Sequence, residues 1–323
     1  MKHLIVTADD YGVFPAINKG VIEAAKSRRL NSVSVLANFA GNENYPGSLD
    51  NLEHLLNETS DLPDELEIGC HLTITSGKPL TGDKMSFACD SQGYFLGYTE
   101  MKNYKNPEEL AAIKEELCEQ VKQLESRGNF KVMHLTNHHN SLTLLPHHFS
   151  IYMEVARLFH LPMRSTRVRP EGRQNFYLRF LNFKLRDDMN PADRADIERF
   201  AREVEDYFRV YNAGIKAPEV LDSRNYGPIS FIPTRLVEYL LVAQKKQNFD
   251  KLYRSFINAQ EDSLELLLHL AKGSGALGVD HSHDLDYPGI DRGYFDSRVA
   301  ELSAVMGYDF NWENVEIKGW REL

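Results

Sequence analysis

The chain has 323 residues, of which 42% are hydrophobic and 11% aromatic, enough for one barrel-sized domain or two smaller ones. Its formal net charge is -10, with acidic and basic residues interspersed, which argues against nucleic acid and anionic membranes as partners. Cys70, Cys89 and Cys118 form no CxxC pair, so a thiolate zinc site is not supported. A sparse, odd cysteine count is typical of a reducing compartment.

The N-terminal apolar stretch is short and meets acidic residues at Asp9 and Asp10. It is too short for a signal peptide, and no apolar run reaches the length of a transmembrane helix. We therefore expect a soluble, cytoplasmic protein.

Apolar runs of strand length alternate along the chain with longer helical patterns. The predicted strands are Leu4 to Thr7, Ser32 to Ala37, Leu66 to Ile74, Lys131 to Leu135, Met163 to Val168 and Ala276 to Val279. The predicted helices are Ala16 to Ser27, Pro107 to Arg127, His147 to Phe159, Pro191 to Tyr211, Pro233 to Lys245 and Ser263 to Ala271. Such alternation predicts βα units and a mainly parallel sheet.

Two predicted helices carry a clear start signal. Asn106-Pro107 and Asn190-Pro191 each place a capping side chain before a proline at the first helical position. Between them, Glu171 to Asp188 is rich in arginine and aromatic residues. That stretch is either a substrate-facing insertion, an interface, or an amphipathic helix with a solvated basic face.

The first predicted strand ends on two adjacent carboxylates, Asp9 and Asp10, and Gly12 follows them. In α/β sheets and barrels, ligands bind beyond the carboxyl ends of the strands. Strand side chains alternate, so one acid can hold a metal while its neighbour faces a water or a substrate. The alternative is that either aspartate only caps the next helix.

Histidines stand at the ends of three further predicted strands. His71 lies in the third; His134, His138 and His139 follow the fourth; His281 and His283 follow the last. Imidazole and carboxylate are usual ligands of a catalytic divalent metal, whose bound water loses its proton to a nearby base. A second group can protonate the leaving group.

The other histidines carry less information. His147 and His148 fit a helix start, whereas His3, His54, His160 and His269 have no acidic or histidine partner at a suggestive spacing. The chain has no GxGxxG after a strand, no Walker loop and no GxSxG, which disfavours dinucleotide, nucleotide and serine-hydrolase chemistry.

Several motifs resemble the YdjC-like carbohydrate deacetylases, a family that includes the chitooligosaccharide deacetylases. They are Thr7-Ala8-Asp9-Asp10-Tyr11-Gly12 with Asn18-Lys19-Gly20-Val21, Gly69-Cys70-His71-Leu72-Thr73 with Gly77-Lys78-Pro79-Leu80, His134-Leu135-Thr136-Asn137-His138-His139 with Pro146, and Asp291 to Leu302 with Arg298 and Glu301. The resemblance covers most of the chain.

The resemblance implies a distorted or incomplete (β/α) barrel, one catalytic domain over residues 1–323 with a possible insertion around 171–190, and a homodimer. It also implies metal-dependent removal of an acetyl group from an N-acetylated mono- or oligosaccharide. By motif position, Asp10, His71 and His138 hold one divalent ion, magnesium or zinc, and Asp9 is the general base. A histidine near the last strand, His281 or His283, protonates the departing amine.

Two motifs depart from the family pattern. Thr136-Asn137 stands where Asp-Ser is usual, so either His138 or His139 could be the ligand, and the register set by His134-Leu135 favours His138. The usual His-Pro-Gly is replaced by Asp280-His281-Ser282-His283, with Pro288-Gly289 later. These changes fall where ligands are positioned and specificity is shaped.

Two other functions fit the same residues. One is hydrolysis of a different ester or amide by the same metal site. The other is a catalytically inactive sugar-binding protein, which would tolerate loss of Asp9 because binding needs no base.

Overall fold

The computed structural model describes residues 1–39, 41, 47–62, 66–101, 103–169, 194–195, 198–200, 202–203, 215–222, 237–273 and 292–323. Several sequence predictions lie outside these residues: the strand at 276–279, the helix start at Asn190-Pro191, the insertion at 171–190, and both His281 and His283. The expected homodimer rests partly on Phe176 to Phe183, which also lie outside, and it stays a prediction that light scattering can test.

The described strands form one parallel sheet. Its order is β4-β3-β2-β1-β7-β6-β5, and β8 pairs with β1 off this path. The sheet curls until Leu135, in one edge strand, meets Met163, which shortly precedes the other edge strand, at a parallel bridge. This curled half-barrel of α/β type confirms the predicted fold class. The strands are β1 Lys2–Tyr11, β2 Ser32–Val35, β3 Glu67–Leu72, β4 Leu135–Asn137, β5 Val168–Arg169, β6 Val220–Asp222, β7 Ser263–Leu268 and β8 Val315–Ile317.

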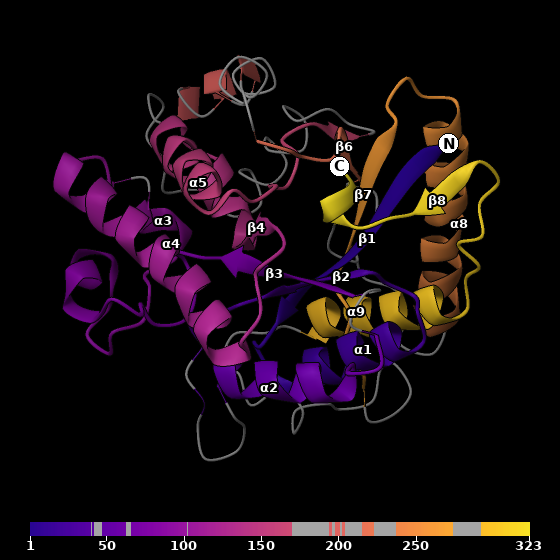
Figure 1. Ribbon diagram of the computed structural model, residues 1–323, viewed down its shortest axis with the longest axis horizontal. Helices are drawn as coiled ribbons and strands as arrows, with labels where there is room; N and C mark the ends of the chain where they lie inside the picture. Colours follow the sequence, from indigo (N-terminus) through magenta and orange to yellow (C-terminus); the bar gives the residue numbers. More distant parts are fainter. Residues whose placement is uncertain are drawn as a thin grey trace.

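The longer helices surround the curled sheet in Figure 1, where neighbours pack in the order α8, α9, α1, α2, α4, α5. The helices are α1 Pro15–Lys26, α2 Ser48–Glu58, α3 Tyr98–Met101, α4 Pro107–Gly128, α5 Pro146–Phe159, α8 Val237–Ile257 and α9 Arg292–Met306. Three short 3-10 helices are η1 Gly82–Ala88, η2 His138–Thr143 and η3 Trp320–Glu322. The start of α4 confirms its prediction: Asn106 accepts from the amide of Glu109 at 2.8 Å, and the two form a capping box.

One prediction was wrong. Residues 263–271 were predicted as a helix, but Ser263–Leu268 is the strand β7. It lies between β1 and β6, and all six of its residues are buried. A strand buried on both faces has a continuous apolar run, which periodicity alone does not distinguish from a buried helix. Sheet pairing therefore overrode the helix propensity of its leucines.

The other predicted elements that the structure describes fall near their predicted places, with shifted ends, whereas α2, β6 and β8 were not predicted. β4 begins at Leu135, at the end of the predicted strand, and extends to Asn137, because the pairing of residues 135–137 with β3 defines it. α8 extends to Ile257, beyond the predicted end at Lys245. His147 and His148 do lie in the first turn of α5, as predicted.

The C-terminal segment closes the amino end of the sheet. Trp320 is fully buried, its ring stacks on His134 with centroids 4.5 Å apart, and its indole N–H donates to Ser32 Oγ at 3.0 Å. Glu67, at the start of β3, accepts from the amides of Trp320 and Arg321 at 2.6 and 3.3 Å and from the Arg321 guanidinium at 2.8 Å. This end is therefore held together by hydrogen bonds to one short segment.

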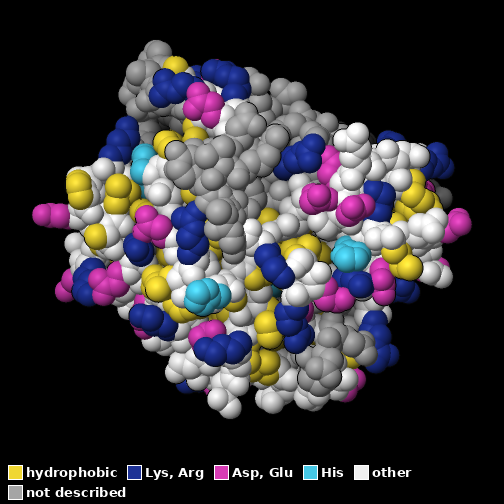
Figure 2. Space-filling view, turned by 45° about the horizontal axis from the view of Figure 1, so that its top comes forward, with side chains coloured by type: hydrophobic (Ala, Val, Ile, Leu, Met, Phe, Trp, Pro, Cys, Tyr) yellow, Lys and Arg dark blue, Asp and Glu magenta, His cyan; other side chains and the backbone are white. Residues whose placement is uncertain are grey.

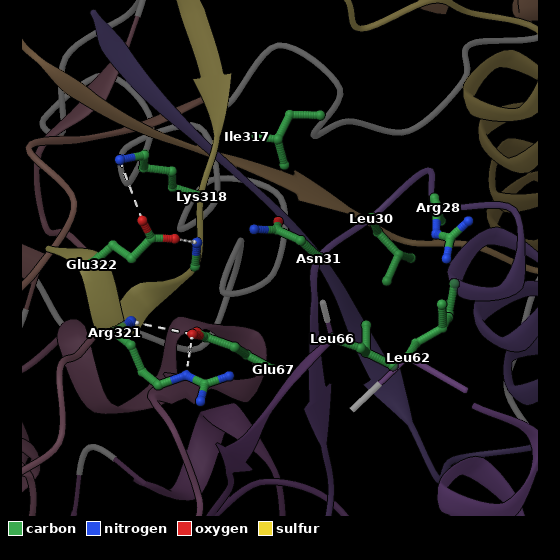
Figure 3. Close-up of a pocket in the computed structure, with 12 residues that line it drawn as sticks. Arg28, Leu30, Asn31, Leu62, Leu66, Glu67, Ile317, Lys318, Arg321 and Glu322 are labelled. Atoms are coloured by element: carbon green, nitrogen blue, oxygen red, sulfur yellow. Dashed lines mark hydrogen bonds and ion pairs between the residues drawn. The ribbon is translucent and has the colours of Figure 1, made fainter. Parts of the chain in front are cut away.

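A cavity of about 530 Å³ opens beside this segment, between α1, the starts of β2 and β3, and the residues after β8 (Figure 3). The charged groups that line it are paired within the protein. Glu67 binds Arg321, and Lys318 lies 3.3 Å from Glu322. The residues that line this cavity thus make the same contacts that hold the C-terminal segment in place.

On the face shown in Figure 2, acidic and basic side chains of the described residues are interspersed and gather in no stripe. None of the described helices is both long enough and apolar enough to cross a bilayer.

Candidate metal centre

A bulge at the carboxyl end of β1 turns two neighbouring aspartates toward the same point. Ala8 pairs with Val33 and Tyr11 with Val35, so β1 has one residue more than β2 between these pairs. Asp10 adopts a left-handed conformation, with φ of 67°, which aspartate tolerates better than most residues. Simple alternation would send the two carboxylates apart. The bulge instead places both within 4 Å of His71 Nε2.

Asp10, His71 and His138 converge at the carboxyl ends of β1, β3 and β4. All three are buried, and one ligand atom from each lies within 4.8 Å of the other two. His138 Nδ1 is 3.0 Å from Asp10 Oδ1 and 3.3 Å from His71 Nε2, and His71 Nε2 is 3.4 Å from Asp10 Oδ1. Burial lowers the pKa of His138 and so favours the neutral imidazole, the form that binds metal.

Thr136 orients one of these groups. It is the register partner of His71 on β4, and its Oγ1 lies 2.7 Å from His71 Nδ1. A proton on Nδ1, donated to this hydroxyl, leaves Nε2 free to face Asp10 and His138. His139 is not part of the group: its Nδ1 lies 3.2 Å from Thr75 Oγ1, and its ring stacks on His138.

Asp9 is held by an arginine that the sequence prediction gave no role. Arg164 Nη1 donates to Asp9 Oδ2 at 2.6 Å, and Nη2 donates to Oδ1 at 2.9 Å. The same guanidinium donates to Glu265 from Nε at 3.1 Å to each oxygen and from Nη2 at 2.6 Å. Burial alone raises the pKa of Asp9, but Arg164 and His71 outweigh it and hold that pKa at about 2. Asp9 is therefore ionised.

A further histidine reaches the group from β7. Ala8 pairs with Leu268, so His269 follows its strand beside Asp9, and its Nε2 lies 3.8 Å from Asp10 Oδ2. Burial lowers the pKa of His269 to about 4. Its backbone amide donates to Glu301 on α9 at 3.0 Å. Arg298, one turn earlier on α9, places Nη2 3.4 Å from Asp10 Oδ2.

No acidic or histidine partner stands at a suggestive spacing from His269 in the sequence, and only the fold brings it beside Asp10. The signal was present in the sequence, because His269 ends an apolar run as Asp9 does. It was missed because that run was interpreted as a helix. Arg164 and Glu265 gave no such signal, since an isolated charge within an apolar run indicates nothing about its partner.

The donor set suits a divalent cation. Two neutral imidazoles and one carboxylate are typical ligands of zinc and related transition ions, and three protein ligands leave a position open for water. Burial raises the pKa of Asp10, but the neighbouring His138 outweighs burial and holds that pKa well below the usual range, so Asp10 is ionised. A buried group of ligand atoms at the carboxyl end of a half-barrel defines the class: an α/β protein with a site that could hold a metal.

Comparison with known proteins then identifies the family. The family model described as YdjC-like protein matches residues 3–311, so this chain belongs to the YdjC-like family. The match covers nearly the whole chain, which confirms the resemblance seen in its motifs.

Curated relatives are similar over about half of this chain. A carbohydrate deacetylase of Thermoanaerobacter pseudethanolicus is 31% identical over 170 residues, which are 51% of this chain and 61% of the relative. A carbohydrate deacetylase of Vibrio cholerae is 30% identical over 165 residues, which are 50% of this chain and 58% of the relative. The chain thus matches little more than half of these relatives' length.

A solved structure shows the same fold over the full length. It is a crystal structure described as that of a cellobiose-phosphate cleavage protein from Enterococcus faecalis V583. The TM-score is 0.66, the sequence identity is 19%, and the alignment covers 99% of this chain and 98% of the other. At this identity the comparison concerns the fold alone.

Proposed function

We propose that this protein is a metal-dependent deacetylase that removes the acetyl group from an N-acetylated mono- or oligosaccharide. The observation that carries the proposal is the convergence of Asp10, His71 and His138 beside an ionised Asp9, at the carboxyl end of the sheet. Membership of the YdjC-like family and the names of the relatives support the choice of substrate.

Asp10, His71 and His138 would hold the ion. The two imidazole donors favour zinc over magnesium, because magnesium prefers an all-oxygen shell. When bound, a divalent cation supplies Lewis-acid activation of water and of a carbonyl oxygen. His139 is not needed as a ligand, since it contacts Thr75.

Hydrolysis of the amide needs a proton acceptor and a proton donor. A water oxygen adds to the carbonyl carbon, the C–N bond breaks, and acetate and a free amine leave. Asp9 would accept the proton of the attacking water, and Arg164 fixes both of its oxygens for that purpose.

We assign the proton donor to His269. It is half-buried after the end of β7, 3.8 Å from Asp10, and Glu301 accepts a hydrogen bond from its backbone amide. An imidazole that is neutral at rest can take up a proton during the reaction and pass it to the departing nitrogen. His281 and His283 stay alternative donors, as the sequence predicts.

The test is release of acetate from a panel of N-acetylated mono- and oligosaccharides, with protein stripped of metal and then reloaded with zinc or magnesium. We expect metal-dependent release from at least one sugar. Release from acetyl esters but from no N-acetyl sugar would point to the other hydrolase function, and sugar binding without release would point to an inactive binding protein.

A further inference from the structure

Asp9 and Asp10 lie at similar distances from His71, and Asp10 also lies 3.0 Å from His138 Nδ1. Asp10 Oδ1 lies 3.4 Å from His71 Nε2, and Asp9 Oδ2 lies 3.7 Å from the same nitrogen. Both side chains are buried, and both come from the same bulge of β1. Their distance from His71 therefore does not decide which aspartate is the ligand.

What differs is how each carboxylate is held. Both oxygens of Asp9 accept strong, charge-assisted hydrogen bonds from Arg164, at 2.6 and 2.9 Å. Asp9 Oδ2, the oxygen nearer to His71, accepts the shorter of these two hydrogen bonds. Asp10 has its arginine contact on Oδ2 alone, at 3.4 Å from Arg298, and its Oδ1 faces the two histidines. Asp10 Oδ1 therefore faces the two histidines without a hydrogen bond to an arginine among the described residues.

Glu265 fixes the orientation of Arg164. It accepts from Nε and Nη2, so the guanidinium contacts one carboxylate along each of two edges. The backbone of Arg164 is anchored as well, because its amide donates to Leu135 O at 2.9 Å. With Arg164, Glu265 and Asp9 all buried, the guanidinium cannot turn away from Asp9 without leaving a buried carboxylate unpaired.

We propose that Arg164, anchored by Glu265, selects the metal ligand: it keeps Asp9 out of the coordination shell, so that Asp10 binds the ion and Asp9 stays available as a base. This inference rests on the proposed function for the role of Asp9. It makes Arg164 and Glu265 positioning residues, whose loss adds a ligand to the metal instead of removing one.

The test measures metal binding by zinc calorimetry and the visible absorption of the cobalt(II)-loaded protein, whose intensity falls as the coordination number rises. We compare wild type with Arg164→Lys and Arg164→Met. Lysine keeps the positive charge but cannot bond both oxygens of Asp9 and Glu265 together. We expect both variants to bind zinc about tenfold more tightly, because added carboxylate ligands raise affinity, and to show a weaker cobalt spectrum.

Adding Asp9→Asn to either variant should restore the wild-type cobalt spectrum and remove the gain in affinity. Arg167→Met is the matched control, because Arg167 lies three residues away and pairs with Glu261 at 2.9 Å; it should change neither measurement. If Arg164→Met does not fold, Arg164→Met with Glu265→Gln removes the unpaired buried charge and carries the same expectation.

Unchanged or weaker zinc binding in the folded Arg164 variants would overturn the inference. Tighter zinc binding in Arg164→Met alone, with an unchanged cobalt spectrum, would also overturn it. Loss of the positive charge of Arg164, which repels the cation, is enough to explain that result. These measurements use no sugar. The inference can therefore fail while the deacetylase proposal stands, or hold in a protein that releases no acetate.

Discussion

The two ends of the curled sheet use buried carboxylates in opposite ways. At the amino end, Glu67 accepts three hydrogen bonds, all from the C-terminal segment beside it. At the carboxyl end, Asp10 turns Oδ1 toward His71 and His138, and its contact with an arginine among the described residues is through Oδ2. A carboxylate with every oxygen satisfied stabilises the fold. A carboxylate that faces histidines through an oxygen not bound by an arginine can bind a cation.

This difference matches the general division of labour in barrels, where activity resides at the carboxyl end and stability at the amino end. It also predicts which measured property depends on each end of the sheet. Substitutions at the carboxyl end should change metal affinity and kcat, and substitutions at the amino end should change the free energy of unfolding.

The largest effects should separate the two adjacent aspartates. Asp10→Asn should weaken metal binding, and added metal should partly rescue activity. Asp9→Asn should keep its metal and lower kcat by about 10²–10⁴-fold, the usual contribution of a positioned base, with no rescue. Calorimetric metal titration beside acetate-release kinetics measures both. If Asp9→Asn lost its metal and Asp10→Asn kept it, the two roles would be reversed.

The next effect concerns the proton donor. His269→Gln should lower kcat by about 10²-fold or more and leave zinc affinity within a few-fold, because the imidazole is a donor and not a ligand. His54→Gln, on the exposed side of α2, is the control and should leave kcat unchanged. Near wild-type kcat in His269→Gln, with a large loss in His281→Gln or His283→Gln, would move the role to that histidine.

At the amino end, Trp320→Ala should lower the free energy of unfolding by about 3–5 kcal/mol, since it empties a fully buried site. Trp320→Phe should cost less, because a ring can still stack on His134 while the indole donor to Ser32 is lost. Denaturant titration gives the values. A tenfold loss of zinc affinity in folded Trp320→Ala would show that the two ends are not separable.

The smallest effect is expected for Glu67→Gln, which keeps the shape and one carbonyl acceptor but removes the charge. It should cost about 1–3 kcal/mol of unfolding free energy, as charge-assisted hydrogen bonds do, without changing kcat or zinc affinity. The same isosteric change at Asp10 should cost activity instead. Equal losses of activity in Glu67→Gln and Asp10→Asn would contradict the distinction between the two ends of the sheet.

Local sequence features determined many of the elements and the three candidate metal ligands. The apolar run before Asp9, the run around His71 and the Asn106-Pro107 helix start act through short-range patterning and capping, which need no knowledge of distant residues. These features predicted the parallel sheet and placed Asp10, His71 and His138 at strand ends. The carboxyl ends of parallel strands converge, and the half-barrel brings the three together as the sequence predicts.

Only the tertiary structure decided the rest. Whether residues 263–268 formed a helix or a strand depended on their neighbours β1 and β6, and with that choice came the place of His269. The bulge that turns Asp9 and Asp10 to one side arises from pairing between β1 and β2. Arg164, Asp9 and Glu265 lie far apart in sequence and meet only when the sheet curls, because a buried charge must find its partner wherever the fold supplies one.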